Sequence, residues 1–186
     1  MDKKVPGAEE ALFIFRQREQ RYLDRSQAGR MLAAVLEQYK GRDVLVLGIP
    51  GGGVPVAAEV ARALDADLDV IVARKLGAPG QPELAIGAVT SNGGRFLNQE
   101  VIEGAGASDD YLQAVTTAEM AEAHRREERF RGGRPAARIR DRIVMVVDDG
   151  LATGATMRAS VRSVRKSGPR DSSSQCRSAR SRPALL

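Results

Sequence analysis

The sequence has few of the residues that build disulfides, metal sites and aromatic cores. Its 186 residues include one Cys (Cys176), one His (His124) and no Trp, and the aromatic residues together make up only 4%. A single cysteine excludes an internal disulfide and a multi-cysteine zinc site, and a single histidine excludes a histidine-rich metal site. The core must therefore be mostly aliphatic.

Long apolar runs are also missing. No run approaches the roughly 20 residues that a membrane-spanning helix needs. The opening residues, MDKKVPGAEE, carry charges with no apolar stretch behind them, so they do not resemble a secretory signal. With 42% hydrophobic and 28% charged residues, the composition is that of a globular domain. We therefore expect a cytoplasmic protein with no membrane partner.

The positive charge is concentrated at one end of the chain. The formal net charge is +5, but residues 158–186 contain seven Arg, one Lys and one Asp, and so carry +7 by themselves. The remaining residues then sum to −2, which is ordinary for a globular domain. A basic tail can bind RNA. Because the rest of the chain is slightly acidic, however, we do not expect a nucleic-acid partner.

The hydrophobic pattern alternates between strands and helices. The continuous apolar runs are typical of strands buried on both faces, and the alternation indicates a parallel sheet flanked by helices, an α/β fold. We expect helices at 8–24, from an N-cap at Ser26 to about Gly41, at 54–64, at 108–130 and from about Ala155. Strands are expected at 44–47, 68–73, 84–89 and 143–147. Residues 77–82 are expected to form a loop.

The loop after the first strand is rich in glycine. Gly51, Gly52 and Gly53 precede a helix, where backbone N–H groups and the helix dipole favour an anion. A tight turn that needs positive φ explains the same residues equally well. Val54 follows in place of the Lys of a P-loop, and the dinucleotide-binding pattern fits only in part. An NADP site, with Arg74 on the 2′-phosphate, remains a weak alternative.

The loop after the third strong strand is acidic and is followed by a phosphate-binding pattern. Five apolar residues lead into Asp148 and Asp149, and a loop with two Thr hydroxyls then opens a helix. Two adjacent carboxylates at a strand end favour a cation or hydroxyl donors, and free N–H groups suit a phosphate. A sugar phosphate combines both features. An Asp-Asp-Gly turn before a capped helix is the plain structural explanation. The functional interpretation would fail if both aspartates were buried in salt bridges and no open hollow lay beside Thr153.

Residues 144–156 resemble the phosphoribosyl-pyrophosphate (PRPP) signature of type I phosphoribosyltransferases, and the order of elements is similar over residues 26–168. The resemblance implies that Asp148 and Asp149 hold the ribose hydroxyls and that the loop after them binds the 5-phosphate. It also implies that the glycine loop and a basic residue after the second strand face the pyrophosphate, with Lys75 assisting catalysis. The implied PRPP-binding residues are Gly51, Gly52, Gly53, Arg74, Lys75, Asp148, Asp149, Gly150, Leu151, Ala152, Thr153, Gly154, Ala155 and Thr156.

The resemblance implies a pentosyltransferase that moves the phosphoribosyl group of PRPP to a small nitrogenous, nucleobase-like acceptor and releases pyrophosphate. Mg²⁺ would be bound with PRPP, with no direct protein ligand or with Asp148 and Asp149 acting through ribose or water. The segment from Gly77 to about Gly94 is the candidate lid, and a homodimer is possible in this family. A non-catalytic regulator that senses PRPP or binds RNA is the alternative.

The end of the chain departs from the resemblance. We divide the sequence into a phosphoribosyltransferase-like domain at 1–168 and an irregular basic tail at 169–186, so the expected sheet is incomplete at its C-terminal end. Serine codons of the TCN type, read one frame over, encode apolar residues, and Ser172–Ser174 would then hide a strand. We hypothesise that this stretch is frame-shifted; AGY serine codons in the coding DNA would contradict this.

Overall fold

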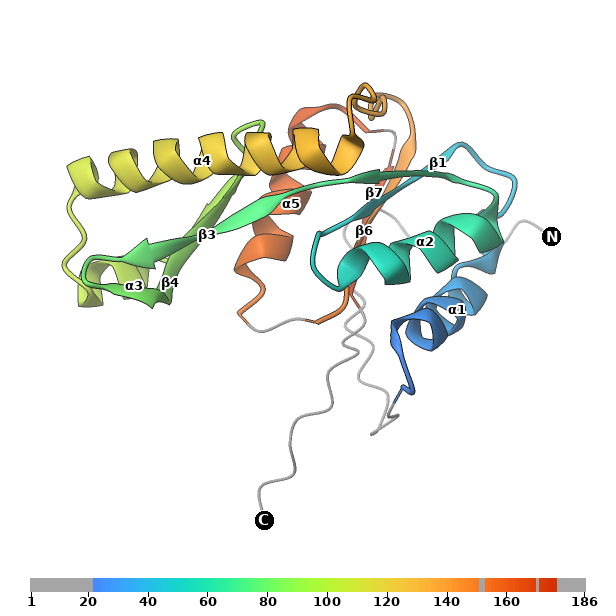
Figure 1. Cartoon of the computed structure of the whole chain (residues 1–186), viewed down its shortest axis with the longest axis horizontal. Helices are drawn as coiled ribbons and strands as arrows, with labels where there is room; N and C mark the ends of the chain where they lie inside the picture. Colours follow the sequence, from blue (N-terminus) through green and yellow to red (C-terminus); the bar gives the residue numbers. More distant parts are fainter. Residues whose placement is uncertain (1–21, 151–152, 170, 177–186) are drawn as a thin grey trace, which may run out of the picture. The chain divides into compact units, whose positions relative to one another are not determined.

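The computed structural model describes residues 22–150, 153–169 and 171–176, which fall into two compact units (Figure 1). The first unit takes its residues from Met1–Asp69, Ala137–Leu151 and Pro169–Leu186, and the second from Val70–Ala136 and Ala152–Gly168. Each unit combines a sheet with packed helices.

The first unit is built on a four-stranded sheet with the order β2-β1-β6-β7. The strands are β1 (Val44–Gly48), β2 (Asp67–Val70), β6 (Ile143–Asp148) and β7 (Asp171–Cys176). β6 pairs in parallel with β1 on one side and with β7 on the other. All five residues of β1 are buried, as its unbroken apolar run predicts. The prediction of an α/β fold with a parallel sheet flanked by helices is confirmed.

The helix α2 (Gly53–Leu64) packs on this sheet, α1 (Arg25–Val35) packs on α2, and a short 3₁₀ helix (Glu37–Tyr39) follows α1. The apolar faces of α1 and α2 form a core with the sheet, made of Leu32, Leu36, Val44, Val46, Val56, Val60, Leu64, Met145 and Val147. The N-cap of α1 is Asp24, whose carboxylate accepts the Gln27 N–H at 2.7 Å, so the expected cap at Ser26 is wrong. A carboxylate two residues earlier reaches the free N–H groups, and Ser26 becomes part of the first turn.

The second unit holds a three-stranded antiparallel sheet of β3 (Ala73–Ala78), β4 (Gln81–Thr90) and β5 (Arg95–Leu97). The loop expected at 77–82 is wrong, because Gly77 and Ala78 end β3 and β4 starts at Gln81. A tight turn with Gly80 at φ +68° joins β3 to β4. The pairing of these two strands is irregular after Leu76. Most of the candidate lid at 77–94 is therefore paired strand.

Three helices complete the second unit: α3 (Gln99–Gly104), α4 (Asp109–Arg131) and α5 (Ala155–Lys166). In Figure 1 the long helix α4 runs beside β3. It begins at the Ser108 N-cap and ends at Gly132, which has φ +58°, as the Gly pair after the helix predicts. The charges of its first and last turns complement the helix dipole.

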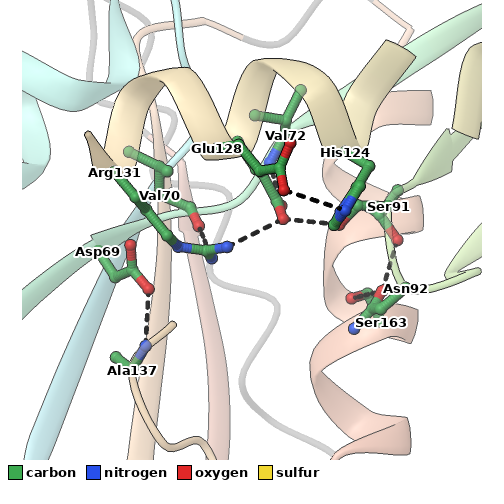
Figure 2. A network of polar contacts seen from close by, with 12 residues as sticks. Asp69, Val70, Val72, Ser91, Asn92, His124, Glu128, Arg131, Ala137 and Ser163 are labelled. Carbon is green, nitrogen blue, oxygen red and sulfur yellow. Dashed lines mark hydrogen bonds and ion pairs between the residues drawn. The ribbon is translucent and has the colours of Figure 1, made fainter. Parts of the chain in front are cut away.

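A buried polar network joins α4 to the residues just before β3 and just after β4 (Figure 2). Glu127 accepts the Val72 N–H at 3.0 Å, the Ser91 hydroxyl at 2.7 Å and an Arg131 N–H at 3.2 Å. Arg131 also donates to the Val70 carbonyl at 3.2 Å. These bonds satisfy a carboxylate that is only 6% exposed. His124, one turn earlier, lies at the surface and faces Glu128 at 3.5 Å.

The expectation of an irregular tail from 169 is wrong for Asp171–Cys176, which form β7. A β6 edge with unpaired N–H and C=O groups can pair with any extended backbone, whatever its side chains. The strand lies where the shifted reading frame would place one. Backbone pairing does not depend on the reading frame, so the frame-shift hypothesis stays a prediction, and residues 177–186 lie outside the described residues.

Candidate functional site

The acidic pair lies where β6 ends, in the first unit. Asp148 is the last residue of the strand and is half-buried, whereas Asp149 lies beyond the strand and is 9% exposed. The Asp149 N–H donates to Asp148 Oδ1 at 2.8 Å, so the backbone turns sharply between them. Since successive strand residues point to opposite faces, ending the strand at Asp148 is what permits both carboxylates to serve one ligand.

The glycine loop lies against this acidic pair. β1 and β6 are neighbours in register, and the Ile49 N–H continues the ladder to the Val147 carbonyl at 2.9 Å. A Cβ at Gly53 would lie 2.8 Å from the Val147 oxygen, and a Cβ at Gly52 would lie 1.7 Å from Asp149 Oδ2. The structure thus brings together Gly52, Gly53, Asp148 and Asp149, and it explains two of the three glycines by close approach. Gly51 has φ +116°, a conformation that glycine alone adopts easily.

Arg25, at the start of α1, also belongs to this cluster, and sequence reasoning missed it. Its Nε and one terminal nitrogen each donate to Asp149 Oδ2 at 3.0 Å. The two residues are 124 positions apart, and no motif or spacing in the sequence links them. Asp149 therefore does lie in a salt bridge, which meets part of the condition stated above against the functional interpretation. Its second oxygen, Oδ1, keeps no partner among the described residues.

The residues expected to bind the 5-phosphate belong partly to the first unit and partly to the second. Gly150 is described in the first unit, Leu151 and Ala152 lie outside the described residues, and the rest open α5 in the second unit. Gly154 is the N-cap of α5 at φ +72°, and the Ala155 N–H points to Thr153 Oγ1 at 3.4 Å. The helix expected after β6 is present, and its N-cap Gly154 has no side chain that could bond the N–H groups of the first turn.

The two basic residues expected near pyrophosphate lie on β3 and have acidic partners in the second unit. Arg74 Nε donates to Glu119 at 2.7 Å, and Lys75 Nζ donates to the Glu83 carboxylate at 3.0 Å and to its carbonyl at 3.3 Å. Lys75 and Glu83 are 40% and 95% exposed, so this pair is weak and exchanges readily with solvent. The roles of Arg74 and Lys75 toward a ligand stay predictions.

The carboxylate of Glu122, on α4, has a lowered pKa. Hydrogen bonds from Arg126 and Arg125 lower the pKa of Glu122 from its usual 4.5 to about 2. The nitrogens lie 2.6 and 2.8 Å from the carboxylate oxygens, one helical turn away. These residues belong to an outward-facing helix surface and do not contribute to the acidic pair.

The acidic pair suits a magnesium ion that arrives with its substrate. In the described parts of the chain, no group of three or more His, Cys, Asp or Glu side chains is arranged to hold a metal. Mg²⁺ usually binds through one or two carboxylates together with substrate phosphates. Asp148 and Asp149 offer carboxylate oxygens that could meet such an ion through the ribose hydroxyls or through water. The residues present therefore fit Mg²⁺ carried by a phosphate ligand.

The chain belongs to the phosphoribosyl transferase domain family, whose model matches residues 22–179. It is 50% identical over 145 residues to the Mycobacterium tuberculosis protein named "Putative phosphoribosyl transferase Rv0571c", and equally to its counterpart MT0597 from a second strain. The match covers 78% of this chain and 33% of those proteins, so the chain spans about a third of their length.

A solved structure supports the same fold. The crystal structure of TT1426 from Thermus thermophilus matches with a TM-score of 0.68 and 42% sequence identity, covering 84% of this chain and 74% of that one. The expected resemblance to type I phosphoribosyltransferases is thereby confirmed at the level of family and fold. Across the described residues, no helix is both long and apolar enough to cross a membrane.

Proposed function

We propose that this protein transfers the phosphoribosyl group of PRPP to a small nitrogenous, nucleobase-like acceptor and releases pyrophosphate. The observation that carries the proposal is the junction of two strand ends in one unit, where Asp148 and Asp149 meet the glycine loop at Gly52 and Gly53. Family membership supports the transferase class. Open α/β sheets bind ligands at the carboxyl ends of their strands, as proposed here.

In this mechanism the aspartates hold the ribose and the loops hold the phosphates. Asp148 and Asp149 accept hydrogen bonds from the ribose hydroxyls and so fix the reacting carbon for attack. The N–H groups of residues 150–156 hold the 5-phosphate, while Gly51–Gly53 let the pyrophosphate approach the backbone. Arg74 and Lys75 are proposed to offset charge on the leaving group. When bound, Mg²⁺ neutralises further charge on the pyrophosphate oxygens.

The finer assignments are part of the same proposal. We propose a PRPP-dependent pentosyltransferase of nucleotide metabolism that works with Mg²⁺ and is located in the cytoplasm; the single cysteine agrees with a reducing compartment. A homodimer is proposed on the family resemblance alone. The acceptor is proposed only as a class, because no residue of the described chain distinguishes purine, pyrimidine or another amine.

No observation favours the rival functions. In the basic helix α5, Arg158 and Arg162 lie over the Phe96 ring at 5.0 and 5.3 Å, and Lys166 donates to the Gly93 carbonyl. These contacts use internally the charge that an RNA-binding surface would offer. The NADP alternative rests on Arg74 and on a partial glycine pattern, and the described structure adds nothing to either.

Calorimetric titration with PRPP and Mg²⁺ tests the proposal. The Asp148→Asn/Asp149→Asn double variant is expected to bind PRPP at least about a hundredfold more weakly, since hydrogen bonds to charged groups contribute roughly 1.5–3 kcal/mol each. Asp141→Asn is the matched control, because Asp141 is an exposed turn residue with φ +63° that Asn tolerates. Unchanged affinity in the double variant would refute the site. A screen of nucleobases for pyrophosphate release would then identify the acceptor.

A further inference from the structure

The salt bridge between Arg25 and Asp149 has an unusual geometry for a purely structural pair. Both donating nitrogens of Arg25 bond to the same oxygen, Asp149 Oδ2, each at 3.0 Å. A guanidinium more often faces both carboxylate oxygens in parallel. Here one oxygen is held twice, and Oδ1 has no partner among the described residues. A carboxylate only 9% exposed therefore keeps an acceptor available.

The glycine loop holds this arrangement from the other side. A Cβ at Gly52 would lie 1.7 Å from Asp149 Oδ2 and 2.3 Å from Arg25 Nε, so the ion pair fills the space next to the loop backbone. Arg25 is itself anchored, because it is the first residue of α1 and follows the Asp24 cap. The Asp149 carboxylate is thus fixed between a helix start and the glycine loop.

The Arg25–Asp149 pair has a larger effect on the orientation of the Asp149 carboxylate than on stability. The Arg25 side chain is 51% exposed, and water weakens an ion pair whose cation is that exposed. The terminal torsion of an aspartate is otherwise broad, so a free carboxylate samples many orientations. Two bonds to Oδ2 restrict that torsion and determine where Oδ1 points.

We propose that Arg25 is a positioning residue that orients Asp149, so that Oδ1 accepts a hydrogen bond from a ribose hydroxyl of the substrate. This inference rests on the proposed function, in which Asp149 holds the ribose. Arg25 acts through Asp149, and its own contact with the pyrophosphate is not required. The ion pair persists when the ligand binds, because Oδ1 and not Oδ2 meets the sugar.

Calorimetry on the full chain with three probes tests this: PRPP with Mg²⁺, ribose 5-phosphate, and inorganic pyrophosphate with Mg²⁺. Arg25→Gln is expected to weaken ribose 5-phosphate and PRPP about ten- to hundredfold, as loss of an orienting partner does at metal sites. Pyrophosphate affinity is expected to stay within about twofold, since Arg25 in this proposal donates to Asp149 and not to the pyrophosphate. A comparable loss for pyrophosphate would make Arg25 a direct phosphate ligand and overturn the inference.

Two further variants separate positioning from folding. Arg30→Gln is the control, because Arg30 is an exposed residue of the same helix, and it should bind all three probes like the parent. Arg25→Lys preserves the charge but not the planar fork and is expected to weaken ribose 5-phosphate about threefold, less than Gln does. Parent-like affinity in both Arg25 variants would overturn the inference, whatever their melting temperatures.

A double-mutant cycle shows whether Arg25 acts through Asp149. In the Asp149→Asn background, Arg25→Gln should cost almost no further PRPP affinity, because the oriented carboxylate is already gone. An undiminished cost there would contradict positioning. The cycle also distinguishes the two proposals: if the parent binds neither PRPP nor ribose 5-phosphate, the proposed function fails, whereas a parent that binds both with no effect of Arg25→Gln defeats this inference alone.

Discussion

Two buried carboxylates, one in each unit, differ in how completely they are satisfied. Glu127 in the second unit is 6% exposed, and both its oxygens accept bonds, from Val72, Ser91 and Arg131. Asp149 in the first unit is 9% exposed, and Arg25 occupies only one of its oxygens. A carboxylate oxygen that no protein group occupies can accept a donor from a ligand. The comparison shows a structural role for Glu127, whereas Asp149 has an oxygen left for the ligand contact proposed above.

Removing the fully satisfied carboxylate should have the largest effect on stability. We expect Glu127→Ala to lower the free energy of unfolding by about 3 kcal/mol, because it removes the acceptor of the buried Val72 N–H and the carboxylate that pairs with Arg131. Urea denaturation measures this. Glu128→Ala is the control, since that side chain is 67% exposed and its loss should cost less than about 0.5 kcal/mol. Equal effects of the two variants would contradict the structural role of Glu127.

A smaller loss is expected where the glycine loop touches β6. Gly53→Ala would place a Cβ 2.8 Å from the Val147 oxygen and 2.9 Å from Asp148 Cα, both backbone atoms that cannot rotate away. We expect a destabilisation of about 2 kcal/mol, typical of overpacking, together with weaker PRPP binding because Asp148 must shift. Gly104→Ala, where nothing lies within 4 Å of the new Cβ, is the control. Unchanged stability of Gly53→Ala would show that the loop has room to move.

The smallest expected effect concerns the exposed carboxylate Glu122. Arg126 and Arg125 hold the pKa of Glu122 at about 2 in the folded protein, below its usual 4.5. The charged form therefore favours folding: its contribution is complete above about pH 4.5 and is lost as the pH falls toward 2. Glu122→Gln should flatten the pH dependence of unfolding between these values, and more so at low salt. Identical slopes for variant and parent would contradict the assignment.

Much of the first unit could be predicted because its pattern is local. The continuous apolar run of Val44–Leu47 and the Ile143–Val147 run before the acidic pair each form a strand, and the strand ends where Asp148 meets Asp149. A strand buried on both faces needs apolar residues at every position, so composition alone reveals it. The predictions were wrong where several local solutions exist, as at the α1 cap and in the β3–β4 hairpin, whose Gly and Pro residues suggested a loop.

The sequence by itself determined the buried strands β1 and β6, the helix α2 between them, the glycine loop and the acidic pair, because each depends on residues that are neighbours in the chain. Only the tertiary structure decided that Arg25 meets Asp149, that Glu127 is buried with three donors, and that the backbone of 171–176 pairs with β6. These contacts join residues tens of positions apart, and electrostatic attraction or backbone pairing leaves no periodic trace in the sequence. The half-satisfied carboxylate at the centre of the proposed function is therefore a property of the fold.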